Sequence, residues 1–223
     1  MIPLRDNIQI RSFPFVTILL FLINCYVFYL ELTATNQQIA EIMNRYSLVP
    51  AAFVKAITQQ SLYMGDYLPL ISNLFLHGGW LHIIGNLWFL FLFGRTSEGC
   101  LGHLKYFIFY LVCGVAANLV QVAFDPSSDI PVIGASGAIS GILGSYIFCF
   151  PRARISTLIP IFFFFTIVEI PALVFIGIWF LLQVYQGTLS GTSMAGSNVA
   201  WWAHIGGFLM GIGLNVMLNR RPN

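Results

Sequence analysis

The sequence predicts an all-α, polytopic membrane protein with six transmembrane helices in a single domain, residues 1–223. Hydrophobic residues make up 58% of its 223 residues and charged residues only 8%, and the mean hydropathy is +0.83. Soluble globular domains carry about 25% charged residues, so this chain has too few charges to cover a surface that faces water. A lipid bilayer is therefore its expected surroundings. The net charge of +2 is too small to indicate a nucleic-acid partner.

Apolar stretches mark the predicted spans, since a transmembrane helix needs about 20 mostly apolar residues. The first stretch is 13–30, and because no small-residue cleavage site follows it, we expect a retained helix rather than a cleaved signal peptide. Residues 31–68 are too polar to cross a membrane and are predicted to hold short interfacial helices. Further spans are predicted at residues 80–93, 104–124, 136–150, 169–186 and 199–218. The apolar run at 158–168 is predicted to be a loop that lies against the protein.

The basic residues indicate how the predicted helices are oriented. Six spans place both termini on one side of the membrane, and cytoplasmic termini agree with the positive-inside rule. Eight of the ten basic residues are then cytoplasmic: Arg5, Arg11, Arg95, Lys105, Arg152, Arg154, Arg220 and Arg221. Arg45 and Lys55 lie outside. No predicted span carries a charge at its middle, which argues against a proton pump, an ion-coupled transporter or a voltage sensor.

Four of the polar residues inside predicted spans stand out, because hydrocarbon penalises unpaired polar side chains. They are His82, Asn86, Ser136 and His204. The second, fourth and sixth spans all enter the membrane from outside, so the four residues lie near the outer face. Each residue alone is typical of helix packing or of a hydrogen bond between helices. Their arrival at one depth from three separate helices favours a functional site.

Helical spacing predicts which of these side chains meet. His82 and Asn86 are four residues apart and share one helix face. Small residues at similar spacing allow transmembrane helices to pack closely, and two sets of residues follow this pattern. The sets are Ser136, Ser140 and Gly144, bordered by Gly137 and Gly141, in the fourth span, and His204, Gly207 and Gly211 in the sixth. We expect these helices to bring the Ser136 hydroxyl within hydrogen-bond reach of His204.

This combination of residues predicts nucleophilic catalysis. A serine hydroxyl becomes a good nucleophile when a general base takes its proton, and a neutral imidazole is such a base. No Asp or Glu lies near His204 in the sequence, so we predict a Ser136–His204 dyad whose imidazole is oriented by packing alone. His82, Asn86 and the Ser136 N–H are predicted to donate hydrogen bonds to the oxyanion. The four cysteines form no CxxC pair, and neither a metal site nor a cofactor is predicted.

Three segments closely resemble motifs of the rhomboid family of intramembrane serine proteases. They are residues 76–87 (LHGGWLHIIGNL), 134–141 (GASGAISG) and 203–208 (AHIGGF), and their order and spacing resemble those of a bacterial six-span rhomboid. The resemblance implies that Ser136 is the nucleophile and His204 the base, with His82 and Asn86 at the oxyanion.

Supporting residues follow from the same resemblance. Gly134 is implied to shape the loop before the nucleophile, Gly137 to belong with the oxyanion and substrate-binding residues, and Ser140 and Gly207 to support helix contact. Some bacterial rhomboids carry a tyrosine at the position of Ser140, where it stacks on the imidazole. The Trp-Arg pair of many first external loops is also missing here.

The resemblance implies a protein of a bacterial inner or plasma membrane whose partners are the lipid bilayer and transmembrane protein substrates. These substrates are expected to be single-span proteins, cleaved near their outer boundary. The uncharged loop at 187–198 is predicted to cap the outer mouth and to move with the fifth span when substrate enters. The main competing function is that of an inactive rhomboid-like protein that binds membrane clients. Two further candidates are a small-molecule transporter, which usually contains repeated halves, and a purely structural membrane protein.

Overall fold

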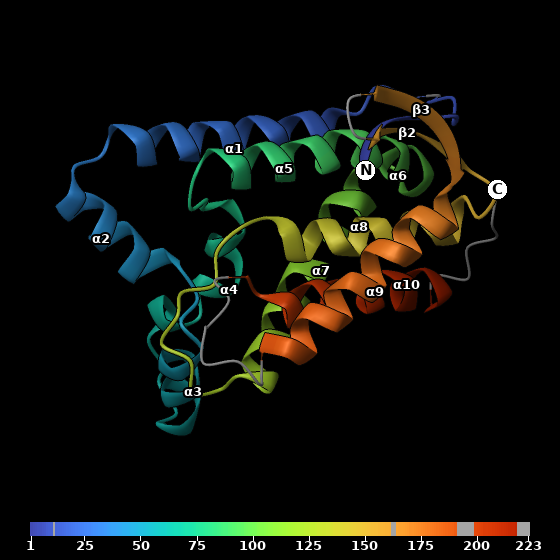
Figure 1. The fold of residues 1–223 in the computed structure, drawn as a ribbon. Helices are drawn as coiled ribbons and strands as arrows, with labels where there is room; N and C mark the ends of the chain where they lie inside the picture. The colour runs from blue at the N-terminus through green and yellow to red at the C-terminus, as the bar shows by residue number, and fades with distance from the viewer. Residues whose placement is uncertain (11, 162–163, 191–198, 218–223) are drawn as a thin grey trace.

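The computed structural model describes residues 1–10, 12–161, 164–190 and 199–217 and consists mainly of helices (Figure 1). The longest are α1 (Phe15–Thr33), α7 (His103–Phe124), α8 (Ser136–Cys149), α9 (Ala172–Ser190) and α10 (Trp201–Met217). These five lie close to the predicted spans, with α9 beginning three residues later than expected.

The predicted second span continues beyond its expected end. α5 (Trp80–Phe89) passes through a π-helical segment, η3 (Leu90–Gly94), into α6 (Arg95–Leu101). A bend of 79° separates these helices from the helical turns before them. Gly79 lies at the bend with a φ of +153°, a conformation that side-chain-bearing residues rarely adopt.

Short helices fill the polar stretch between α1 and α5, as the sequence predicts. They are α2 (Asn36–Tyr46), α3 (Pro50–Thr58), η1 (Met64–Asp66), α4 (Pro69–Ser72) and η2 (Asn73–Phe75). A reciprocal capping box of Thr35 and Gln38 starts α2, because each side chain bonds a backbone N–H that the helix leaves unpaired. Figure 1 shows α2 and α3 beyond one end of α1, on the side where α5 and α8 begin.

Length and composition support fewer membrane crossings than the six predicted. Among the described residues, α1, α7 and residues 172–189 of α9 are each long and apolar enough to cross, and the bent pair at 64–75 and 80–101 adds a fourth if it counts as one span. α8 has 14 residues and α10 has 17. At 1.5 Å per residue α8 is about 21 Å long, less than the roughly 30 Å of the hydrocarbon core. The number of six crossings therefore remains a proposal, which requires that α8 and α10 also cross the membrane.

The prediction of an all-α fold is wrong at one end of the molecule, where a three-stranded antiparallel sheet forms. β1 (Ile2–Asp6) pairs with β2 (Arg154–Ile161), and β2 pairs with β3 (Phe164–Pro171). Of the run at 158–168, predicted as a loop, residues 158–161 belong to β2 and residues 164–168 to β3, and the Ile, Thr and Val residues among them favour strands. Figure 1 shows this sheet beside the N-terminus and α6.

Side chains from three helices hold the N-terminal strand in place. Asp6 Oδ2 accepts hydrogen bonds from Thr96 Oγ1 at 2.8 Å and from the Tyr146 hydroxyl at 3.1 Å. Trp88 Nε1 donates to the carbonyl oxygen of Pro3 at 2.7 Å. The strand is therefore bonded to α5, α6 and α8 as well as to β2.

α8 is the central helix of the bundle, since it packs against α7 and α10 and buries nearly all of its residues. Its contact with α10 is made by the backbones themselves. A Cβ atom at Gly211 would collide with the carbonyl oxygen of Gly141, so only glycine allows this distance. The small residues predicted such an approach, and Gly144 of the stripe that contains Ser136 also takes part, since a Cβ atom there would collide with the carbonyl oxygen of Phe208.

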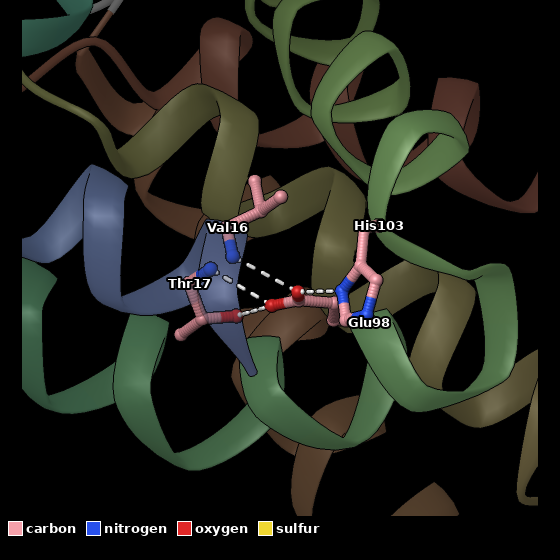
Figure 2. A network of polar contacts seen from close by, with 4 residues as sticks. All are labelled: Val16, Thr17, Glu98 and His103. Carbon is pink, nitrogen blue, oxygen red and sulfur yellow. Dashed lines mark hydrogen bonds and ion pairs between the residues drawn. The ribbon is translucent and has the colours of Figure 1, made fainter. Parts of the chain in front are cut away.

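A buried carboxylate joins the start of α1 to α6 (Figure 2). Glu98 is fully buried and accepts hydrogen bonds from the N–H groups of Val16 and Thr17 at 2.9 and 2.8 Å and from the Thr17 hydroxyl at 2.7 Å. His103 Nδ1 contacts the same carboxylate. Unpaired N–H groups and the helix dipole favour a negative charge at a helix N-terminus, so Glu98 fixes α1 against α6.

We expect Glu98→Gln to destabilise the protein by about 1.5–3 kcal/mol, the range for hydrogen bonds to a charged group. The variant has nearly the same shape, but its amide turns a donor toward backbone donors. Glu41→Gln is the matched control, because Glu41 is exposed on α2 and its loss should change stability by less than about 0.5 kcal/mol. Thermal unfolding in detergent measures both variants, and equal melting temperatures for the two would contradict the anchoring role.

Candidate active site

Ser136 is the first residue of α8, and the loop before it has an unusual backbone. Gly134 has a φ of +111°, in the left-handed region that favours glycine. Its N–H donates to the carbonyl oxygen of Asn73 at 2.8 Å. Among the described residues no side chain caps α8 at Ala135, which leaves the N–H groups of its first turn available to a ligand.

His204 lies in the first turn of α10 and reaches Ser136 across the helix contact. Its Nε2 is 2.8 Å from the Ser136 Oγ. Gln121 of α7 accepts a hydrogen bond from the N–H of Ala203 at 3.2 Å and so helps to fix where α10 begins. The structure thus brings together two side chains that lie 68 residues apart in the chain.

His82 and Asn86 face the same site from α5. A Cβ atom at Gly134 would lie 2.5 Å from His82 Nε2 and 3.4 Å from Asn86 Nδ2, so both side chains lie against the loop before Ser136. The Gly78 N–H donates to His82 Nδ1 at 3.4 Å, which leaves the proton of a neutral imidazole on Nε2. Asn86 is buried, and within the part of the chain that the structure describes its Nδ2 has no hydrogen-bond partner. Both side chains therefore offer N–H donors beside the nucleophile.

A residue that the sequence analysis missed completes the surroundings of His204. Gln183 of α9 lies with its Oε1 2.8 Å from His204 Nδ1. The ring centroids of Trp179 and Trp201 lie 6.2 and 5.9 Å from that of the imidazole. The prediction that packing alone orients the imidazole is therefore wrong, because a hydrogen-bond acceptor reaches its second nitrogen. The available signal was an amide side chain within a mostly apolar span.

Of the other predicted site residues, Gly137 and Gly207 lie in contacts between helices, whereas the bond of Ser140 lies within α8. Ser140 is buried, and its Oγ donates to the carbonyl oxygen of Ser136 at 2.7 Å. A Cβ atom at Gly207 would collide with the carbonyl oxygen of Gly137, and one at Gly137 would lie 2.6 Å from the Cβ of Ala117. Gly137 therefore sits where α7, α8 and α10 meet.

His77 supports the loop that leads into α5. Its N–H donates to both carboxylate oxygens of Glu31 at 3.1 and 3.3 Å, and its ring meets that of Phe28 edge-on. Burial lowers the pKa of His77 to about 4, and the neighbouring His82 acts in the same direction. A neutral His77 at physiological pH thus holds the bend beside His82 without contacting Ser136.

An open cavity of about 1140 Å³ contains the site. Ser136, His204, His82 and Asn86 all line it, together with Met43 of α2. Ligand pockets commonly measure about 300–1,000 Å³, so the cavity has room for a stretch of polypeptide. Of the predicted cap at 187–198, the structure describes only the last turn of α9, and residues 191–198 lie outside the described residues.

Helices apolar enough to cross a membrane thus surround a hydrogen-bonded serine and histidine with two side-chain donors beside the serine. A comparison with known protein families shows to which family the chain belongs. The family model described as Rhomboid domain matches residues 64–221, which include all three motifs, so the chain belongs to the rhomboid family.

Relatives occur in plants and bacteria. RHOMBOID-like protein 5 of Arabidopsis thaliana is 31% identical over 169 residues, which cover 75% of this chain and 49% of the relative. Rhomboid-like protein 11, chloroplastic, of the same plant is 31% identical over 174 residues, covering 74% and 58%. The putative rhomboid protease YdcA of Bacillus subtilis is 34% identical over 84 residues, covering 38% and 42%. This chain thus spans about half the length of the relatives that it matches.

Proposed function

We propose that this chain is an intramembrane serine endopeptidase that cleaves single-span membrane proteins through a Ser136–His204 dyad. The observation that carries the proposal is the 2.8 Å contact between Ser136 Oγ and His204 Nε2. Two N–H donors beside it, on His82 and Asn86, support the same chemistry. Family membership supports a protease-like role.

In the proposed mechanism, Ser136 Oγ attacks the carbonyl carbon of the scissile amide while His204 Nε2 takes the hydroxyl proton. Negative charge then develops on the carbonyl oxygen. His82 Nε2–H, Asn86 Nδ2–H and the Ser136 N–H stabilise that oxyanion. As the C–N bond breaks, His204 passes its proton to the leaving amine, and an acyl ester remains on Ser136. Water activated by His204 hydrolyses the ester and restores the serine.

The proposed substrate follows from the surroundings of the site. A helix in lipid hides its amides in internal hydrogen bonds, so the segment to be cut must unwind, and the open cavity offers room and polar partners for it. The positive-inside rule supports cytoplasmic termini, because Arg5 lies in β1, Arg95 in α6 and Lys105 in the first turn of α7. β1 and α6 contact Tyr146 and Cys149 at the end of α8 opposite Ser136. The cut is then expected near the extracytoplasmic boundary of the substrate.

Cleavage of labelled single-span proteins by the purified chain in detergent tests this function, with the products mapped by mass spectrometry. We expect at least one member of a panel to be cut at a single amide close to the extracytoplasmic end of its span. A cut near the cytoplasmic end would contradict the orientation. Stable binding of panel members without any cleavage would favour an inactive client-binding protein instead.

A further inference from the structure

We propose that Gln183 is a positioning residue for His204, so that the site is a Ser136–His204–Gln183 triad in which a neutral amide stands where other serine hydrolases use a carboxylate. This inference rests on the proposed function. It concerns one bond, between Gln183 Oε1 and His204 Nδ1, which are 2.8 Å apart.

The direction of this bond follows from the second contact of the same amide. Gln183 Nε2 lies 3.0 Å from the carbonyl oxygen of Trp179. A carbonyl oxygen only accepts hydrogen bonds, so the NH₂ group must face Trp179 and the Oε1 must face His204. Because Oε1 also only accepts, His204 Nδ1 must carry the proton.

The tautomer of His204 then determines what it does for Ser136. A neutral imidazole with its proton on Nδ1 has a free lone pair on Nε2, which is the atom 2.8 Å from Ser136 Oγ. The hydroxyl therefore donates to the imidazole, as a general base requires. In the opposite tautomer Nε2–H would donate to the hydroxyl, and the base would be lost.

Because Gln183 is buried, its bond strongly favours the His204 tautomer that carries the proton on Nδ1. Gln183 is 6% exposed, and the rings of Trp179 and Trp201 flank the imidazole. Without Gln183 the Nδ1–H would be a donor that has lost its acceptor, a penalty that the other tautomer avoids. A neutral amide supplies the acceptor without bringing a carboxylate into a low-dielectric site, which is costly.

A purely structural role for Gln183, holding α9 against α10, predicts different behaviour. It would make stability depend on Gln183 but leave the chemical step and the tautomer unchanged in any variant that folds. Measuring kcat and the protonation of His204 Nδ1 in variants of Gln183 therefore distinguishes the positioning role from the structural role.

The decisive comparison uses Gln183→Met, which keeps length and removes the acceptor, and Gln183→Glu, which restores an acceptor oxygen. We expect Gln183→Met to lower kcat by about 10- to 100-fold, by analogy with the loss of a partner that orients a metal-binding histidine, with KM nearly unchanged. Gln183→Glu should recover most of the loss. Leu182→Met is the matched control, since Leu182 is exposed on the same helix, and it should behave as wild type.

Nitrogen-15 NMR of histidine-labelled protein supplies a readout that does not depend on turnover, because the chemical shift of each ring nitrogen reports whether it is protonated. We expect a protonated Nδ1 for His204 in the wild type and a shift toward Nε2 protonation in Gln183→Met. An active wild type with an equally active Gln183→Met, or an Nε2-protonated His204 in the wild type, would overturn the triad. Wild-type protein without cleavage activity refutes the proposed function instead, and the NMR result still decides the role of Gln183.

Discussion

Replacing Ser136 or His204 with alanine is expected to reduce proteolysis of a single-span substrate to background. Removing the nucleophile or the base of another serine protease lowers kcat by about 10⁶-fold, and removing both costs little more, because the residues act as a unit. The two side chains share one hydrogen bond here, so we expect the double variant to be no slower than either single variant. Initial rates with a fluorescent substrate in detergent measure the loss.

The control for these variants is Ser145→Ala, which removes a buried hydroxyl from the same helix more than two turns away from Ser136. We expect it to keep wild-type activity. All variants should elute as folded protein in size-exclusion chromatography and melt within a few degrees of wild type. Cleavage at the wild-type rate by Ser136→Ala or by His204→Ala would rule out the dyad.

His82→Ala and Asn86→Ala are each expected to lower kcat by about 10²- to 10³-fold, the cost of losing one oxyanion donor. The reason is geometric, since Nε2 of His82 and Nδ2 of Asn86 both lie against Gly134, two residues before the nucleophile. Because these donors act on charge that develops in the transition state, KM should change little. Steady-state kinetics with the same fluorescent substrate separates kcat from KM.

A matched control for the second prediction is Asn44→Ala, which removes an exposed amide from α2. It should leave both constants unchanged. If Asn86→Ala raised KM while kcat stayed constant, the amide would act in substrate binding rather than on the oxyanion.

Much of the helical arrangement was predictable, because long apolar stretches and their polar boundaries are strong signals. The sheet was not. The run at 158–168 is short and apolar, and periodicity alone does not distinguish a buried loop, a strand or a lipid-facing helix in such a run. Its pairing with β1 also joins residues about 150 positions apart, which no local pattern records. The π-helical η3 likewise depends on packing rather than on local propensity, whereas the bend at Gly79 uses a backbone conformation that glycine allows.

Part of the candidate site could likewise be predicted from the sequence, and part of it could not. Ser136 and His204 could be singled out because glycines beside each of them predict a close contact between their helices. Gln183 could not be assigned a partner, because apolar residues occur on every side of α9 and its sequence does not indicate which face meets α10. The loop glycine Gly134 was identified only through the family resemblance, and its φ of +111° supplies the physical reason for it.

The most direct test of the Ser136–His204 pair is the intact mass of the purified protein after exposure to a fluorophosphonate, which phosphonylates an activated serine and releases fluoride. We predict one adduct per chain, mapped by peptide mass spectrometry to Ser136, and no adduct in His204→Ala. Adduct formation on a different serine, or undiminished labelling of Ser136 in His204→Ala, would contradict the claim that the histidine activates this hydroxyl.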